Sequence, residues 1–131
     1  NRTRTITILT FFLLAFAAVA QQTITRGGVP GDLDAATEGW KMIESGALLI
    51  DVRSGGEYAG GHIENSTNIP HTELDEIVKL IGPDKDRPVV LYCRSGNRSG
   101  RVTAALEGLG YTAAFNATGW EALEATRPAS D

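Results

Sequence analysis

Apolar residues recur with helical spacing in four stretches of the chain. The first three stretches are each followed by a glycine, and the fourth begins near Trp120 and ends before Pro128. The apolar positions of the first three are Leu33, Ala36, Trp40 and Ile43; Leu74, Ile77, Val78 and Ile81; and Val102, Ala105, Leu106 and Leu109. A Thr72-x-x-Asp75 pattern, typical of a helix N-cap, precedes the second stretch. The spacing therefore predicts four helices.

Short apolar runs alternate with these helices and predict strands. The clearest runs are 48–52, 88–92 and 112–115, and weaker candidates lie at 67–69 and 23–25. Continuous apolar strands that alternate with helices are typical of a parallel sheet covered on both faces. We therefore predict an α/β fold with an open, mainly parallel sheet. Glycine pairs on either side of residues 57–59 indicate a loop around a single helical turn.

The first twenty residues differ from the rest of the chain. Arg2 and Arg4 precede an apolar run of fifteen residues, 6–20, which ends in the small residues Ala18-Val19-Ala20. This order is typical of a secretory signal peptide, whereas a helix that spans a bilayer needs roughly twenty apolar residues. We expect cleavage of residues 1–20, a single domain at 21–131 and no stable membrane insertion after cleavage. A retained anchor is the alternative.

The charge of the expected mature chain bears on its partners. Cleavage removes two of the twelve basic residues and no acidic one, which leaves ten basic against sixteen acidic residues. A net charge of minus six argues against nucleic acid as a partner.

Cys93 is the only cysteine, and it lies where the predicted strand at 88–92 gives way to a polar loop and a helix. Ligand sites of α/β folds lie at such strand ends. Loop amides and the start of the following helix favour a thiolate, as do the charges of Arg94 and Arg98. With Arg101, whose role stays open, they form a basic cluster in an acidic chain. This cluster indicates an anionic substrate or intermediate.

These residues resemble the rhodanese family of sulfurtransferases, and the resemblance runs from about Asp34 to Pro128. Cys93-Arg94-Ser95-Gly96-Asn97-Arg98-Ser99 matches the active-site loop of the family. Upstream, Leu49-Ile50-Asp51-Val52-Arg53, Glu57-Tyr58 and Gly61-His62-Ile63 resemble its first signature, and Asn68-Ile69-Pro70 the continuation. Two signatures in the right order are more specific than either alone.

The resemblance implies a sheet of about five strands and a nucleophile, Cys93, that carries a transferable sulfur as a persulfide. The sulfur would come from thiosulfate or a similar small anionic donor and pass to cyanide or a thiol. No metal or organic cofactor is implied. The implied substrate-binding residues are Arg94, Ser95, Gly96, Asn97, Arg98 and Ser99. Asp51 and Arg53 could support the site, although tying the next loop to the body of the fold is the stronger interpretation.

Two segments depart from the family pattern. Asn65-Ser66-Thr67 stands where a small pair, commonly Gly-Ala, is usual, and Asn116-Ala117-Thr118-Gly119 replaces a run with several glycines. The backbone near residue 65 is therefore expected to differ slightly. Neither departure touches the cysteine loop.

Two other functions remain open. One is a non-enzymatic persulfide carrier or binding module. The other is a cysteine phosphatase or arsenate reductase, in which five residues separate the cysteine from the loop arginine, whereas four separate Cys93 from Arg98 here. His62 and His71 are too far apart in sequence to be argued as metal ligands.

Three glycosylation sequons, at Asn65, Asn97 and Asn116, bear on the compartment. A glycan on Asn97 would block the proposed loop. We therefore favour export to a bacterial periplasm.

The apolar leader yields a first prediction. The exported protein should begin at or near Gln21, because small residues precede the expected cleavage site. N-terminal sequencing of the exported form measures this. A chain that still begins near Asn1 and sediments with membranes would show that the leader is an anchor.

Overall fold

The structure, a computed structural model, describes residues 28–129. Within this range the chain forms a four-stranded, fully parallel sheet with the strand order β2-β1-β3-β4. In chain order the elements are α2 (Leu33–Glu44), β1 (Leu48–Asp51), α3 (Gly55–Ala59), β2 (Thr67–Asn68), α4 (Leu74–Ile81), β3 (Val89–Cys93), α5 (Asn97–Gly108), β4 (Ala114–Gly119) and α6 (Trp120–Ala125). The candidate strand at 23–25 lies outside the described residues.

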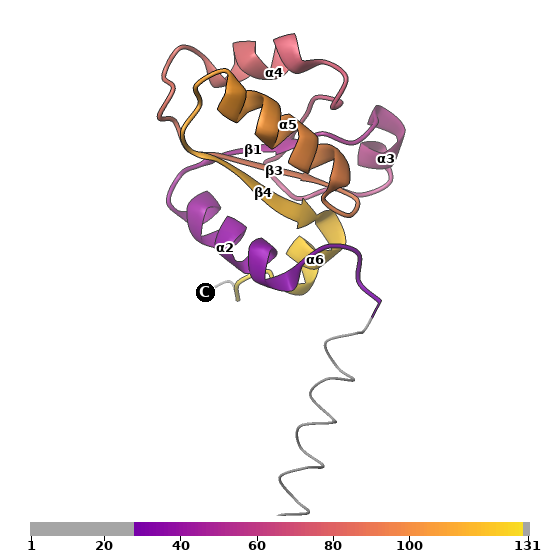
Figure 1. Ribbon diagram of the computed structural model, residues 1–131. Helices are drawn as coiled ribbons and strands as arrows, with labels where there is room; N and C mark the ends of the chain where they lie inside the picture. Colours follow the sequence, from indigo (N-terminus) through magenta and orange to yellow (C-terminus); the bar gives the residue numbers. More distant parts are fainter. Residues whose placement is uncertain (1–27, 130–131) are drawn as a thin grey trace, which may run out of the picture.

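Helices cover both faces of the sheet, as the alternation of elements predicted. Helices α4 and α5 lie over one face, and α2 and α6 lie over the other (Figure 1). Successive strand residues face opposite layers, so Ile50 and Leu91 join the core under α4 and α5, while Leu49 and Val90 join the core under α2 and α6. Because the central strands are apolar on both faces, they sit between two helical layers.

The last strand differs from its prediction. It begins at Ala114 and continues to Gly119, whereas the apolar run indicated 112–115. Ala117 is fully buried against α2 and α6, and the polar side chain of Asn116 faces α5, where it hydrogen-bonds with Ser99. A polar residue with a partner inside the fold broke the apolar pattern on which the prediction depended.

The predicted cap of α4 is wrong. The N-cap is Glu73 and no side chain caps the helix, because Thr72 lies in the turn before it. Asp75 and Glu76 occupy the first turn, where negative charge interacts favourably with the helix dipole. The single helical turn predicted near Glu57 is present as α3, which opens with a capping box between Ser54 and Glu57.

Across residues 28–129, none of the helices combines the length and apolar character needed to cross a bilayer.

Candidate active site

Cys93 is the last residue of β3 and is 1% exposed. The chain then turns through Gly96, whose φ of 105° lies in the left-handed region that favours glycine, and enters α5 at Asn97. This turn points backbone amides at the sulfur: the Sγ atom lies 3.1 Å from the Gly96 nitrogen and 3.5 Å from that of Ser99. The Ser99 Oγ atom lies 3.3 Å from the same sulfur. The loop therefore surrounds one buried sulfur with neutral donors.

The surroundings of Cys93 favour its thiolate. Burial alone would raise the pKa of the thiol, but hydrogen bonds from the Ser99 hydroxyl and from the amides of Ser99, Gly96 and Ser95 outweigh it. The net effect is a lowered pKa. Hydrogen bonds at the sulfur, rather than arginine charges, are thus the main cause of this shift.

Close contacts on the side of β4 hold the loop in place. Cys93 pairs with Gly119 after a shift in register, and a Cβ atom on Gly119 would lie 2.6 Å from the Arg94 carbonyl oxygen. A Cβ atom on Gly96 would lie 2.9 Å from that of Thr118. These distances are shorter than van der Waals contact, so both positions require glycine if the loop is to keep its place.

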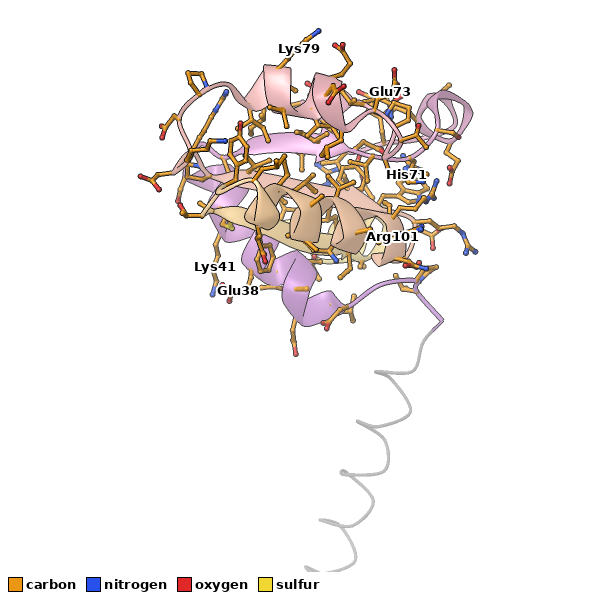
Figure 2. All side chains as sticks on the ribbon, turned by 45° about the horizontal axis from the view of Figure 1, so that its top comes forward. Glu38, Lys41, His71, Glu73, Lys79 and Arg101 are labelled. Carbon is orange, nitrogen blue, oxygen red and sulfur yellow. The ribbon has the colours of Figure 1, made fainter. Side chains whose placement is uncertain are left out.

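The remaining loop side chains divide between the rim and the interior. Arg94, Ser95 and Asn97 are exposed, and Arg94 forms no ion pair with any residue in the range 28–129. Arg101 is exposed one helical turn beyond the loop, on α5 (Figure 2). The structure thus brings the predicted loop residues together at the carboxyl end of β3, and it leaves Arg94 accessible to an anion.

Arg98 has a partner within the protein. Its Nη1 and Nη2 atoms donate to the two carboxylate oxygens of Glu57, on α3, at 2.7 and 3.0 Å. This forked pair raises the pKa of Arg98 and lowers that of Glu57 to about 2. The charge of Arg98 is therefore balanced beside the loop, and α3 is tied to the first turn of α5.

Asp51 and Arg53 form a buried ion pair at the carboxyl end of β1. The carboxylate of Asp51 is fully buried, and the Nη2 atom of Arg53 donates to it at 2.7 Å and to the Gly61 carbonyl at 2.6 Å. The guanidinium also lies 5.8 and 5.0 Å from the ring centres of Tyr92 and Trp120. The pair ties the loop after β1 to the sheet, in agreement with the structural interpretation of these residues.

Sequence reasoning missed two residues that contact the site. Glu57 lies in a segment that resembles the family signature, and only its opposite charge could have indicated the pairing with Arg98. Asn116 hydrogen-bonds with Ser99 and with the Gly96 carbonyl, but in the sequence it is a polar residue after an apolar run. No pattern in the sequence indicated its position at the cysteine loop.

The two histidines lie apart from the sulfur's hydrogen bonds. His62 is exposed and stacks on Tyr58, with ring centres 3.7 Å apart. His71 (Figure 2) is partly buried, and its backbone nitrogen donates to the Val52 carbonyl. Among the described residues, no three His, Cys, Asp or Glu side chains are grouped so as to hold a metal ion.

The fold and the site together define an α/β protein with a cysteine held in an amide-lined loop at the end of a central strand. Residues 35–126 match the model of the Rhodanese-like domain. The chain belongs to this family, as its sequence motifs indicated.

Several relatives of known name share this region. The chain is 44% identical over 73 residues to the uncharacterized protein YqhL of Bacillus subtilis, and 39% identical over 70 residues to the thiosulfate sulfurtransferase PspE of Escherichia coli. The matches cover 56% and 53% of this chain and 56% and 67% of those proteins. The structure superimposes on the human single-domain sulfurtransferase TSTD1 with a TM-score of 0.58 and 30% identity, over 70% of this chain and 93% of that one.

Another relative shares a smaller part of its length with the chain. A tRNA uridine(34) hydroxylase of Escherichia coli is 31% identical over 103 residues, which are 76% of this chain but 29% of that protein. The family model and the two relatives that are named as sulfurtransferases, PspE and TSTD1, support sulfurtransferase activity at the level of the family.

The buried ion pair yields a stability prediction. Arg53→Met should lower the free energy of unfolding by about 3 to 5 kcal/mol, because it leaves the fully buried Asp51 carboxylate without its partner. Urea unfolding measures the change. Lys79→Met is the matched control. Lys79 projects from the exposed side of α4 (Figure 2) and pairs with Glu76, and the loss of this pair should cost less than about 1 kcal/mol. Equal effects of the two substitutions would contradict a special role for the Asp51–Arg53 pair.

Proposed function

We propose that this protein transfers sulfane sulfur from thiosulfate, or a similar small anionic donor, to cyanide or a thiol through a persulfide on Cys93. The observation that carries the proposal is the buried sulfur, which faces the Gly96 and Ser99 amides and the Ser99 hydroxyl. These donors suit a sulfur anion in the resting enzyme and in the sulfur-loaded enzyme. We also propose export to the periplasm, for which the leader sequence is the support.

The proposed reaction has two steps. The Cys93 thiolate attacks the outer sulfur of thiosulfate, a new S–S bond forms to Cys93, and the S–S bond within the donor breaks as sulfite leaves with the electron pair. The acceptor then attacks the outer sulfur of the persulfide. The bond to Cys93 breaks, its electron pair returns to Cys93 as thiolate, and cyanide becomes thiocyanate. No proton is required when the acceptor is an anion.

Arg94 is the group best placed to bring an anionic donor to the loop. It is exposed next to the cysteine, while the charge of Arg98 is engaged by Glu57. Because the rest of the mature chain is acidic, a cation at the rim opposes the general repulsion of anions. Donor binding therefore combines one rim charge with the loop amides.

A persulfide carrier that serves one partner uses the same chemistry without rapid turnover on small molecules. Turnover with free thiosulfate and cyanide separates the carrier from the enzyme.

A mass measurement tests the persulfide. After incubation with thiosulfate, the intact protein should gain the mass of one sulfur atom, and cyanide should remove it, because the chain has only one cysteine to carry it. Cys93→Ser should gain nothing, since an alcohol does not ionise near neutrality or form the persulfide. Failure of the wild-type protein to gain sulfur, or retention of turnover by Cys93→Ser, would contradict the proposal.

Steady-state kinetics test the rim charge. Arg94→Ala should lower kcat/KM for thiosulfate, varied at saturating cyanide, by about ten- to 150-fold, because one charge-assisted contact is lost. Lys79→Ala removes the same charge from the outer side of α4 and should have little effect (Figure 2). If Arg94→Ala equals this control, donor binding depends on the loop amides alone.

The same assay separates the two loop arginines. Arg98→Ala leaves the Glu57 carboxylate unbalanced beside the site, where it repels the donor. The double variant Arg98→Ala/Glu57→Gln removes both charges and should recover most of the lost activity. Equal losses in the single and double variants would instead show that Arg98 itself contacts the donor.

A further inference from the structure

Asn116, on β4, makes three hydrogen bonds around the cysteine loop. Its Nδ2 atom donates to the Gly96 carbonyl at 3.0 Å, and its Oδ1 atom accepts from the Thr118 amide at 3.0 Å and from the Ser99 hydroxyl at 2.7 Å. Exchanging the oxygen and nitrogen of this amide would set an oxygen against a carbonyl and an NH₂ group against an N–H. The network therefore fixes the orientation of the Asn116 amide.

The Ser99 hydroxyl has one proton and two neighbours that can accept it. Oδ1 of Asn116 lies 2.7 Å from Oγ, and Sγ of Cys93 lies 3.3 Å from it. With a neutral thiol both contacts are satisfied, because the thiol donates to Oγ while Oγ donates to Asn116. With a thiolate, the two acceptors compete for the single proton. Asn116 thus stabilises the thiol relative to the thiolate.

The same side chain supports a strained backbone behind the loop. Thr118 has a φ of 72°, in the left-handed region that β-branched residues rarely adopt. Its amide is bonded to Asn116 Oδ1, and its Oγ1 accepts from the Asp32 amide at 2.8 Å. Asn116 therefore supports the Thr118 backbone of β4, against which Gly96 packs.

We infer that Asn116 is a positioning residue that competes with the Cys93 sulfur for the Ser99 hydroxyl proton and so limits how far the loop stabilises the thiolate. The inference rests on the proposed function, in which Cys93 is the nucleophile. It has a chemical purpose, because the nucleophilicity of a thiolate falls as its pKa falls, and the best attacking thiol ionises near the ambient pH. If no acceptor competed for the Ser99 proton, more of Cys93 would be thiolate, but that thiolate would be a weaker nucleophile.

The charged side chains around the sulfur are separate from Ser99 and Asn116. Arg98 on α5 interacts with Cys93 and is balanced by Glu57 on α3, and Arg94 follows the cysteine in the chain. At the end of the neighbouring strand β1, Asp51 and Arg53 pair with each other. None of these groups is altered, so differences among the variants report on Ser99 and Asn116.

The test measures the effect of Ser99→Ala on thiol ionisation in three backgrounds: wild type, Asn116→Ala and Asn116→Leu. The rate of alkylation by neutral iodoacetamide as a function of pH gives the ionisation midpoint, and Cys93 is the only thiol that reacts. Ser99→Ala should raise the midpoint in wild type. It should raise it more in Asn116→Ala and in Asn116→Leu, where the hydroxyl has no competing acceptor and is free to donate to sulfur.

We expect the acid dissociation constant to change on Ser99→Ala by about threefold more in Asn116→Ala than in wild type. Substitution of Asn116 also removes its hydrogen bond to Gly96. This loss is the same with Ser99 and with Ser99→Ala in a given background, so it cancels when the effect of Ser99→Ala is compared. Equal effects in the three backgrounds, or the reverse order, would overturn the inference. If Asn116→Ala does not fold, the comparison of wild type with Asn116→Leu decides between the same outcomes. Alkylation requires no sulfur transfer, so failure of the proposed function would appear only in the mass measurement.

Discussion

The ion pair between Asp51 and Arg53 is the interaction on which the carboxyl edge of the sheet depends. A buried carboxylate is tolerated only when a partner and hydrogen bonds replace its hydration, and Asp51 receives bonds from both the side chain and the backbone amide of Arg53. Through the same guanidinium the pair reaches Gly61, Tyr92 and Trp120. One desolvated pair thereby joins β1, the loop after α3, β3 and the start of α6.

The cysteine loop is built on this edge and uses a different kind of electrostatics. Its donors are backbone amides and a hydroxyl, held by close backbone packing against Gly119 and Thr118. The forked pair of Arg98 with Glu57 adds rigidity but little net charge. The buried ion pair thus orders the edge of the sheet, and the fixed dipoles of the loop amides face the Cys93 sulfur.

The sequence predicted most of the elements because their burial follows a regular period. The helical spacing from Leu33 to Ile43 and the apolar run of β3 each reflect a face packed on one core. Prediction failed where a polar side chain finds its partner far along the chain. The Asn116 side chain forms a hydrogen bond with Ser99, which stabilises a longer β4. Glu57 forms an ion pair with Arg98, which lies 41 residues further along the chain. Such pairings depend on the tertiary fold and leave no period in the sequence.

Neutral donors are well matched to the charge balance of the proposed cycle. The resting thiolate and the sulfur-loaded persulfide each carry one negative charge, since the incoming sulfur brings no net charge and sulfite leaves with that of the donor. A site that met this charge with a mobile cation would have to reorganise as the charge moved from Cys93 Sγ to the outer sulfur. Amides of a rigid loop need no such movement, because their dipoles are already directed at the region that both sulfurs share. The tight contacts that exclude a side chain at Gly96 and Gly119 are therefore part of the chemistry, since they keep those dipoles fixed while the anion moves.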